Sequence, residues 1–200
     1  MNYYFITGSS SGIGKAIVEE LLKYPNNKVI GLSRTNTHGD KQFEYCKCDL
    51  SKGAEVKAFK FENIERAERI ILINNAGDIG EIAYVGQQSD DNIIASSMVN
   101  FTSAAVLMNK FISVYQNFEG EKIIINVSSG AADSAYDGWA NYCSAKAALN
   151  MFTRVIHEEQ LGQNYPVQAY AIAPGVVDTS MQDIIRDVEE DSFSRIEKFR

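Results

Sequence analysis

The chain has 200 residues, 45% of them hydrophobic and 22% charged, a composition that indicates one soluble globular domain with a sizeable core. Its net charge of −7 argues against a nucleic-acid-binding protein, which would present a basic surface. Residues 1–6 lack the features of a secretory signal peptide, and no apolar run of about 18 residues predicts a membrane span.

The first predicted strand, residues 3–7, leads into a glycine-rich turn. Apolar residues then recur at helical spacing as far as Pro25. Glycines permit a tight turn and a close approach of the backbone to a pyrophosphate, and the following helix N-terminus offers free N–H groups to the phosphates. This context favours a dinucleotide site over an ordinary glycine turn. The residues expected to contact the cofactor here are Gly8, Ser10, Ser11, Gly12, Ile13 and Gly14.

The second predicted strand, residues 28–33, ends in Ser33-Arg34. An acidic residue at this point would bind the ribose hydroxyls of NAD and repel a 2′-phosphate, and the sequence has none here. Arg34 instead offers a planar cation suited to a phosphate, and Lys15 follows directly after Gly14. The pattern predicts NADP(H) as the cofactor, the alternative being that Arg34 is an ordinary solvated side chain.

Strands and helices continue to alternate along the rest of the chain. Further strands are predicted at residues 43–48, 69–73, 122–127 and 167–173, and the run at 69–73 is nearly all apolar, as in a strand buried on both faces. Helices are predicted over residues 51–61, capped by Ser51, from Ser89 to about Gln116, and from Trp139 to about Leu161. This order predicts an α/β fold with a doubly wound, parallel, Rossmann-type sheet in three α/β/α layers.

Tyr142 and Lys146 stand four positions apart in the last predicted helix, which places them on one face, one turn apart. A phenol alone titrates near pH 10, and a neighbouring ammonium lowers its pKa. A drop of about three units, worth roughly 4 kcal/mol, would suit Tyr142 for acid–base chemistry. Ser129 follows a predicted strand, at the edge where open parallel sheets bind their ligands. A Tyr–Lys pair at this spacing also arises by chance on solvated helix faces.

The three cysteines form an odd-numbered set, which is typical of reduced thiols in a cytoplasmic protein. Cys46 and Cys48 would share one strand face, but with only His38 and His157 elsewhere the sequence does not predict a metal site. No repeat, linker or low-complexity segment is apparent. Residues 1–200 are therefore expected to form a single dinucleotide-binding and catalytic domain.

Taken together, these residues resemble the short-chain dehydrogenase/reductase family over the whole chain. Each motif alone is a weak signal, but their number and order are specific. The matching residues are Thr7, Gly8, Gly12 and Gly14 of the cofactor turn, Asn74, Asn75, Ala76 and Gly77 after the fourth strand, the catalytic tetrad Asn100, Ser129, Tyr142 and Lys146, and Pro174, Gly175 and Thr179 on the nicotinamide side.

The resemblance implies a role for each residue of the tetrad. Tyr142 would protonate the carbonyl oxygen as the nicotinamide delivers hydride to the carbon, and Ser129 would bind the developing oxyanion. Lys146 would lower the pKa of Tyr142 and hold the nicotinamide ribose, and Asn100 would position a water that relays protons to Lys146. The implied cofactor contacts also include Asp49 and Leu50 at the adenine, Asn75, Ala76 and Gly77 at the ribose, and Pro174, Gly175, Val177 and Thr179 at the nicotinamide.

Within the family, residues 138–143 and 173–182 look most similar to the sepiapterin reductases and bacterial benzil reductases, which reduce a carbonyl, often of a vicinal diketone, with NADPH. Family members normally continue through another helix and a seventh strand, whereas this sequence stops at Arg200. The last strand is thus expected to be missing and the domain incomplete at its C-terminus, the alternative being that the sixth strand is an exposed edge of the sheet. Because that region supplies the carboxylate that anchors the pterin in sepiapterin reductase, pterin specificity is not transferred to this chain.

The expected activity is NADPH-dependent reduction of a ketone or vicinal diketone, with Tyr142 as the general acid. The alternatives are an alcohol dehydrogenase acting in the oxidative direction and a non-catalytic nucleotide-sensing scaffold on the same fold. Tyr136, Trp139 and Met181 are expected to line the substrate pocket with Ser129 and Tyr142, favouring a flat conjugated carbonyl compound. Trp139 would otherwise simply pack the start of its helix.

Two predicted helices, residues 91–116 and 139–161, have more apolar residues than one sheet face needs. Family members commonly pair these helices across a two-fold axis, so the resemblance implies a homodimer. The alternative is that the surplus belongs to the ordinary core, and neither a nucleic-acid nor a membrane partner is expected. The residues concerned include Val106, Met108, Phe111, Met151, Phe152 and Val155.

Overall fold

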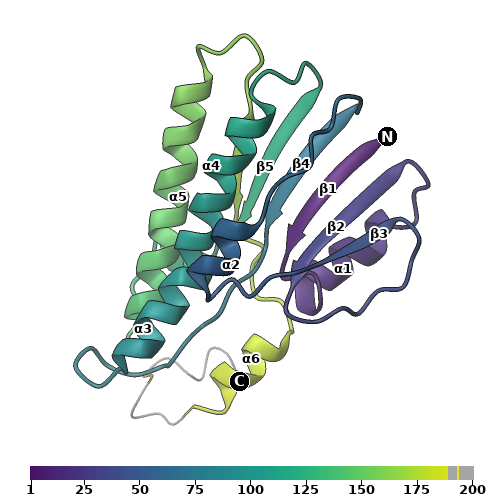
Figure 1. The fold of residues 1–200 in the computed structure, drawn as a ribbon. Coiled ribbons are helices and arrows are strands. Elements are labelled where there is room, and N and C mark those ends of the chain that lie inside the picture. Colours follow the sequence, from purple (N-terminus) through teal and green to yellow (C-terminus); the bar gives the residue numbers. More distant parts are fainter. Residues whose placement is uncertain (189–192, 194–200) are drawn as a thin grey trace.

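The predicted parallel sheet is present in the computed structural model, which describes residues 1–188 and residue 193 (Figure 1). Each predicted strand agrees with an observed one to within one or two residues at either end. The α/β Rossmann-type fold is therefore confirmed. The strands of the described residues are β1 (Asn2–Thr7), β2 (Asn27–Ser33), β3 (Phe43–Lys47), β4 (Arg69–Asn74), β5 (Glu121–Val127) and β6 (Gln168–Ile172).

The strand order β3-β2-β1-β4-β5-β6 reverses its direction of winding between β1 and β4. All pairs are parallel, and β1 aligns Asn2 with Asn27 of β2 and with Arg69 of β4. The carboxyl ends of these strands consequently lie along one edge. In open parallel sheets ligands bind outside this edge, at the point where the strand order reverses. The fold thus places the glycine-rich turn after β1 beside the motif that follows β4.

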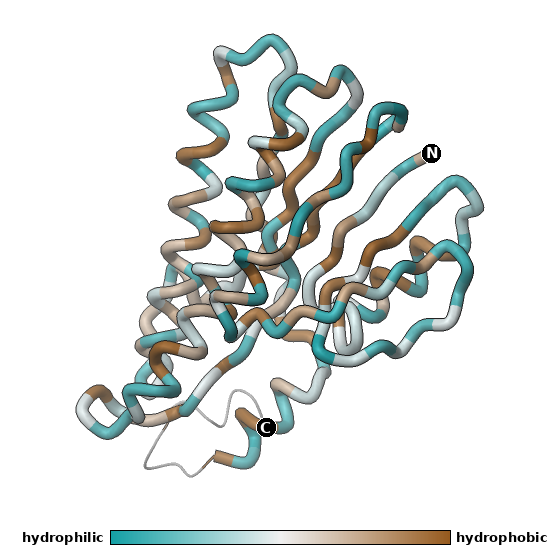
Figure 2. The backbone as a smooth tube through the Cα atoms, in the orientation of Figure 1, coloured by the Kyte–Doolittle hydropathy of each residue, from teal (hydrophilic) through white to brown (hydrophobic). Residues whose placement is uncertain are grey.

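Helices lie on both faces of the sheet (Figure 1). On one face α2 (Gly53–Ala58), α4 (Ser103–Tyr115) and α5 (Ala140–Gln160) contribute to a single buried cluster with the strands. On the other face α1 (Gly12–Leu21) packs Val18 against Ile6 and Val29. Figure 2 shows hydrophobic segments along the strands between the helices, whereas the loops beyond their ends are mostly hydrophilic.

The helix predicted over residues 51–61 begins later than expected. The residue at the N-cap of α2 is Lys52, and Ser51 does not cap the helix. The Ser51 hydroxyl instead donates to Asp49 Oδ1 at 2.7 Å. A local side-chain bond therefore competes with the predicted cap, as is common for serine.

The same helix also ends earlier than predicted, at Ala58. Lys110 of α4 donates its Nζ hydrogens to the carbonyls of Val56 and Phe59, at 3.1 and 2.7 Å, and so binds the end of the helix. Phe61 leaves the helical path and packs edge-on against Phe5 of β1, with ring centroids 4.8 Å apart. Contacts from distant strands and helices thus override the local helical pattern.

The predicted helix from Ser89 to Gln116 is present but is not regular. Ser89 caps it as predicted, accepting a hydrogen bond of 3.3 Å from the backbone of Asn92. Asn100 lies in a π-helical segment, a form that holds an extra residue in the turn and is frequent at functional sites. The three parts are α3 (Asp90–Ser97), the π segment Met98–Thr102 and α4.

A short helix that was not predicted, α6 (Ser180–Arg186), follows β6 and lies beyond the carboxyl ends of the strands (Figure 1). Arg186 binds Asp178 at 2.9 Å and so ties the end of the helix to the loop before it. Within residues 1–188, no helix is long and apolar enough to cross a membrane.

Candidate active site

The glycine-rich turn after β1 has a backbone conformation and a close packing that residues with side chains could not adopt. Gly8 and Gly12 have φ angles of +67° and +51°, in the left-handed region that favours glycine. A Cβ on Gly14 would lie 2.3 Å from the Gly8 carbonyl oxygen, so only glycine lets α1 approach β1 this closely. Ser11 precedes α1 and makes no side-chain cap, which leaves the first N–H groups of the helix available to an anion.

The motif after β4 is bonded directly to this turn. The backbone N–H groups of Asn75 and Ala76 both donate to the Thr7 hydroxyl at 3.0 Å. The Asn75 amide also donates to the Thr7 carbonyl at 3.1 Å. These bonds join the ends of β1 and β4 where the strand order reverses, and so fix the wall of the crevice.

The end of β2 supplies the side chains expected at the adenosine. Ser33 is 6% exposed and Leu50 is 8% exposed, while Arg34 is exposed. The hydrogen bond from the Ser51 hydroxyl, with smaller contributions from Lys52 and Arg34, holds the pKa of Asp49 below its usual value. Asp49 is thus ionised near neutral pH and complements the cation of Arg34.

The loop after β6 lies against the glycine-rich turn from the opposite side. Gly175 has a φ angle of +80°, which turns the chain after Pro174. The Thr179 methyl lies 3.3 Å from where a Gly12 Cβ would stand. The two loops therefore meet across the end of the sheet, and Val177 lies between Gly175 and Thr179 on the cleft side.

Tyr142 and Lys146 lie one turn apart on α5, as predicted. Tyr142 is 7% exposed and Lys146 is 3% exposed. Lys146 Nζ lies 5.6 Å from the centre of the Tyr142 ring and donates to the Val127 carbonyl at 2.8 Å. Ser129 follows β5, and its Oγ accepts a bond of 3.2 Å from the N–H of Ala131, which fixes the hydroxyl near the phenol.

Burial shifts the pKa values of both α5 residues. It lowers the pKa of Lys146 to about 8. It also raises the pKa of Tyr142, and the hydrogen bond with Ser129 only partly opposes this. The expected lowering of the Tyr142 pKa is therefore wrong for this structure, because desolvation of the buried phenol outweighs every group that would stabilise its anion.

Asn100, the fourth predicted member of the tetrad, is 1% exposed and is held by the segment after β4. Its amide donates to the carbonyl of Asp78 at 2.6 Å, and its Oδ1 accepts from the Asp78 N–H at 2.9 Å. Asn100 Oδ1 and Lys146 Nζ lie 3.4 and 3.6 Å from where a Cβ of Gly77 would stand. Asn100 and Lys146 thus approach each other across this glycine.

One cleft of about 820 Å³ connects these parts. Every residue expected to contact the cofactor lines it except Gly14, which lies behind the turn, and so do all the residues expected to contact the substrate. At the substrate end Tyr136 stacks on Trp139, with centroids 5.1 Å apart, and Trp139 meets the Tyr142 ring edge-on at 6.0 Å. The open helix N-terminus, the glycine turn and Arg34 fit a nicotinamide dinucleotide.

Sequence reasoning missed part of the substrate end of the cleft. Ile79, Gln182 and Ile185 also line it, and Gln182 is 8% exposed. Among the described residues, Gln182 Oε1 is a buried acceptor without a hydrogen-bond partner. Gln182 and Ile185 are three positions apart in α6, but a helix this short gives too weak a periodicity to predict.

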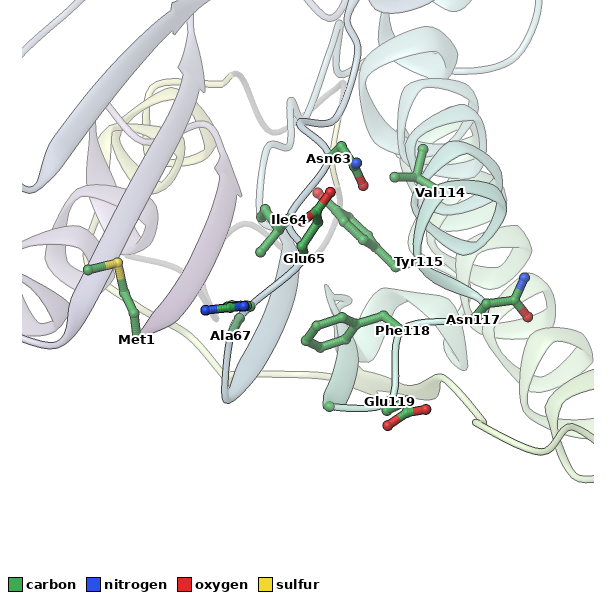
Figure 3. Close-up of a pocket in the computed structure, with 12 residues that line it drawn as sticks. Met1, Asn63, Ile64, Glu65, Ala67, Val114, Tyr115, Asn117, Phe118 and Glu119 are labelled. Carbon is green, nitrogen blue, oxygen red and sulfur yellow. The ribbon is translucent and has the colours of Figure 1, made fainter.

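A second cavity of about 800 Å³ opens elsewhere, around Met1, the segment that precedes β4 and the end of α4 (Figure 3). Its lining includes Ile64, Tyr115 and Phe118, and the Tyr115 hydroxyl donates to the Glu62 carbonyl at 2.6 Å. None of the predicted catalytic or cofactor residues lines this cavity. The chemistry of the protein is therefore assigned to the cleft.

Comparison with known proteins agrees with this geometry. The sequence pattern of the short chain dehydrogenase family matches residues 2–190. The chain belongs to this family. It is accordingly an oxidoreductase of a family that binds a nicotinamide cofactor.

Among curated relatives, the benzil reductase ((S)-benzoin forming) of Bacillus subtilis is 37% identical over 207 residues, covering 100% of this chain and 84% of the relative. The sepiapterin reductase of Xenopus laevis is 28% identical over 200 residues, covering 90% and 74%. Among solved structures, the KRED1-Pglu enzyme superposes with a TM-score of 0.85 at 27% identity, covering 100% and 85%. The predicted resemblance to the benzil and sepiapterin reductases is confirmed.

Proposed function

We propose that the protein is an NADPH-dependent carbonyl reductase that acts on a ketone or a vicinal diketone. The observation that carries the proposal is the convergence of Ser129, Tyr142 and Lys146 beside a glycine-rich turn within one cleft. The similarity to a benzil reductase, which covers 100% of this chain and 84% of that protein, supports the same substrate class.

In this proposal each polar group at the end of the cleft has a separate task. The bound cofactor supplies the hydride. Tyr142, whose raised pKa keeps it protonated at neutral pH, donates its proton to the carbonyl oxygen, a step that contributes about 10²–10⁴-fold in other enzymes. The Ser129 hydroxyl donates a hydrogen bond to the same oxygen as negative charge develops on it.

Lys146 and Asn100 act behind the phenol. With its pKa lowered to about 8, Lys146 exchanges protons readily near neutral pH and returns one towards Tyr142. Asn100 Oδ1 faces Lys146 across Gly77 and positions the water through which that proton arrives. Lys146 also holds the nicotinamide ribose when the cofactor is bound.

The preference for NADPH is assigned to Arg34. Its guanidinium is exposed at the end of β2 and lines the cleft beside Ser33 and Ser11. A planar cation binds a ribose 2′-phosphate through paired charge-assisted hydrogen bonds. NADH has no group for Arg34 to bind in this way.

The aromatic stack of Tyr136 and Trp139 supports a flat conjugated substrate. Both rings line the cleft next to Tyr142, and Met181 packs against the same apolar cluster. Apolar and aromatic walls with a few polar groups are typical of small-molecule sites. Two alternative functions remain. One is an alcohol dehydrogenase, in which the same residues remove a proton from an alcohol, and the other is a non-catalytic nucleotide sensor.

We further propose a cytoplasmic homodimer. Met151 and Val155 of α5 are 56% and 46% exposed, so they are available to pair with a second copy. Met108 and Phe111, which were expected to contribute to the apolar surplus, are fully buried in the core and do not. Cys46, Cys48 and Cys143 are free thiols, which agrees with a reducing compartment.

The direct test mixes the protein with NADPH and a panel of vicinal diketones, monoketones and aliphatic aldehydes, and follows loss of the nicotinamide absorbance. Turnover of at least one aromatic diketone is expected. Turnover only of alcohols with NADP⁺ would favour the dehydrogenase reading, and cofactor binding without any turnover would favour the sensor.

A further inference from the structure

The loop between β2 and β3 is fastened to the glycine-rich turn by its own side chains. His38 donates from Nε2–H to the Ser9 carbonyl at 3.0 Å. One residue earlier, the Thr37 hydroxyl donates to the Ser10 carbonyl at 3.4 Å. The loop residues 34–37 are exposed, so these bonds hold a segment that the core does not.

Ser9 is the point at which the turn, the strand and the loop meet. It is 1% exposed, and its hydroxyl donates to the Ser33 hydroxyl at 3.2 Å while its carbonyl accepts from His38. Ser33 in turn donates to the Thr35 carbonyl at 2.7 Å. Both neighbours of Arg34 in the sequence are therefore bonded to one connected network that includes the turn.

The His38 ring occupies a built site. It is half-buried and packs on Phe43 of β3, with ring centroids 4.6 Å apart and planes inclined at 50°. Gly31 of β2 makes room for this arrangement, because a Cβ there would lie 2.5 Å from the Phe43 ring and 2.5 Å from the Ser9 hydroxyl. The absence of a side chain at Gly31 thus allows Phe43 and the turn to meet and His38 to cover the junction.

We propose that His38 is a positioning residue for cofactor selection. It holds the loop bearing Arg34 at a fixed distance from the glycine-rich turn, so that Arg34 can bind the 2′-phosphate while the turn binds the pyrophosphate of the same cofactor. This inference rests on the proposed preference for NADPH. Ser10, Ser11 and Gly12 line the cleft where the pyrophosphate would bind, and Arg34 lines it at the adenosine end. His38 does not line the cleft, so it acts through the backbone of the turn.

The hydrogen bond from His38 to the Ser9 carbonyl acts as a clamp between the loop and the turn. Its effect on binding should differ between the two cofactors. Binding to a preformed site avoids the entropic cost of ordering a loop. Only a ligand with a 2′-phosphate binds Arg34. When the clamp is lost, the cost of ordering the loop that bears Arg34 therefore weakens the binding of that ligand alone. A ligand without the phosphate contacts the turn, which α1 and the motif after β4 hold in place.

The test measures binding of adenosine 2′,5′-bisphosphate and of AMP, two fragments that differ only in the 2′-phosphate, by calorimetry. His38→Ala should weaken the bisphosphate about tenfold, the value of one hydrogen bond of about 1.4 kcal/mol, and AMP less than about twofold. His38→Gln should recover most of the affinity, because its Nε2 can donate to the same carbonyl. His157→Ala, which removes the exposed histidine of α5, is the matched control and should change neither.

Equal weakening of both fragments, or failure of His38→Gln to recover binding, would overturn the role in selection and leave His38 as support for the turn. A wild-type protein that binds both fragments equally would contradict the NADPH preference itself, and this inference with it. Thermal unfolding checks that each variant is folded. If His38→Ala does not fold, His38→Asn replaces it. Its shorter amide fills part of the space of the ring beside Phe43 but does not reach Ser9, so the same selective loss of bisphosphate binding is expected.

Discussion

Lys146 Nζ lies over the Tyr142 ring, 5.6 Å from its centre, and donates to the Val127 carbonyl at 2.8 Å. The ammonium is therefore enclosed by α5, the Tyr142 ring and the end of β5. Such a position is unfavourable for a charge, which is why the pKa of Lys146 is lowered to about 8. The first two predictions follow from this pair.

Tyr142→Phe should abolish turnover and leave NADPH binding unchanged. Phenylalanine preserves the edge-on packing against Trp139 and removes only the transferable proton. The measurements are kcat with an aromatic diketone and the Kd of NADPH by fluorescence. Retention of more than a few per cent of kcat would show that another group is the acid.

Lys146→Met should inactivate the enzyme and stabilise the fold at pH 7. The folded pKa of about 8 lies below the ordinary value of 10.5, so the unfolded chain binds more protons between these values and wild-type stability rises with pH across that window. Below pH 8 the buried charge costs on the order of 3 kcal/mol, against about 1 kcal/mol for the lost hydrogen bond to Val127.

Urea unfolding of wild type and Lys146→Met at pH 7 and pH 10 tests this. We expect the variant to be about 2 kcal/mol more stable at pH 7, with the difference shrinking as the pH rises. A variant less stable at pH 7, or a difference independent of pH, would contradict the assignment of a lowered pKa.

Arg34→Ala should raise KM for NADPH by about tenfold or more and change KM for NADH little, since only NADPH has the phosphate that Arg34 binds. Lys57→Ala, which removes an exposed cation of α2 that does not line the cleft, is the control for a general loss of positive charge. Equal effects of Arg34→Ala on both cofactors would mean that Arg34 does not read the 2′-phosphate.

Trp139→Ala should lower kcat/KM for aromatic diketones about tenfold, or roughly 1.4 kcal/mol of transition-state binding, with the Kd of NADPH unchanged. The reason is the loss of the ring that stacks on Tyr136 beside the reacting carbonyl. Small aliphatic ketones are the internal control. If they lose as much as aromatic ones, Trp139 supports the helix start and does not recognise substrate.

Met151→Glu should convert the proposed dimer into a monomer, because it places a charge on the exposed apolar face of α5. Val85→Glu, at a loop residue that is 82% exposed, should leave the assembly unchanged. Light scattering at micromolar concentration distinguishes the two. A wild-type monomer under these conditions would contradict the proposal.

The sequence predicted the elements whose signals are local. The strands appear as apolar runs, and Ser89 with its aspartates marks a helix start, so both agree with the structure. The cleft could also be anticipated, because the residues that form it all follow the carboxyl ends of parallel strands. The fold brings such residues together whatever the exact boundaries are.

The features that were missed depend on contacts between distant residues. The early end of α2 is set by Lys110, more than fifty residues away in the chain. The pKa of Tyr142 depends on how completely α5 and the loops bury it, which no spacing reveals. The clamp at His38 likewise needs the fold to place it against Ser9.

The π-helical segment around Asn100 links the active site to the core through helix geometry. Its extra residue lets α3 and Asn100 face Asp78 while α4 directs Leu107, Met108 and Phe111 into the core. Each residue of an α-helix turns the chain by about 100°. The extra residue of the π segment is taken up within one turn, so the helices on either side of it keep their facing. Deleting one residue from Met98–Thr102 other than Asn100 would therefore leave a regular α-helix, in which α4 still faces the core but the Asn100 amide no longer lies opposite Asp78. The length of this segment thus sets the position of an active-site amide, while the packing of α4 on the sheet does not depend on it.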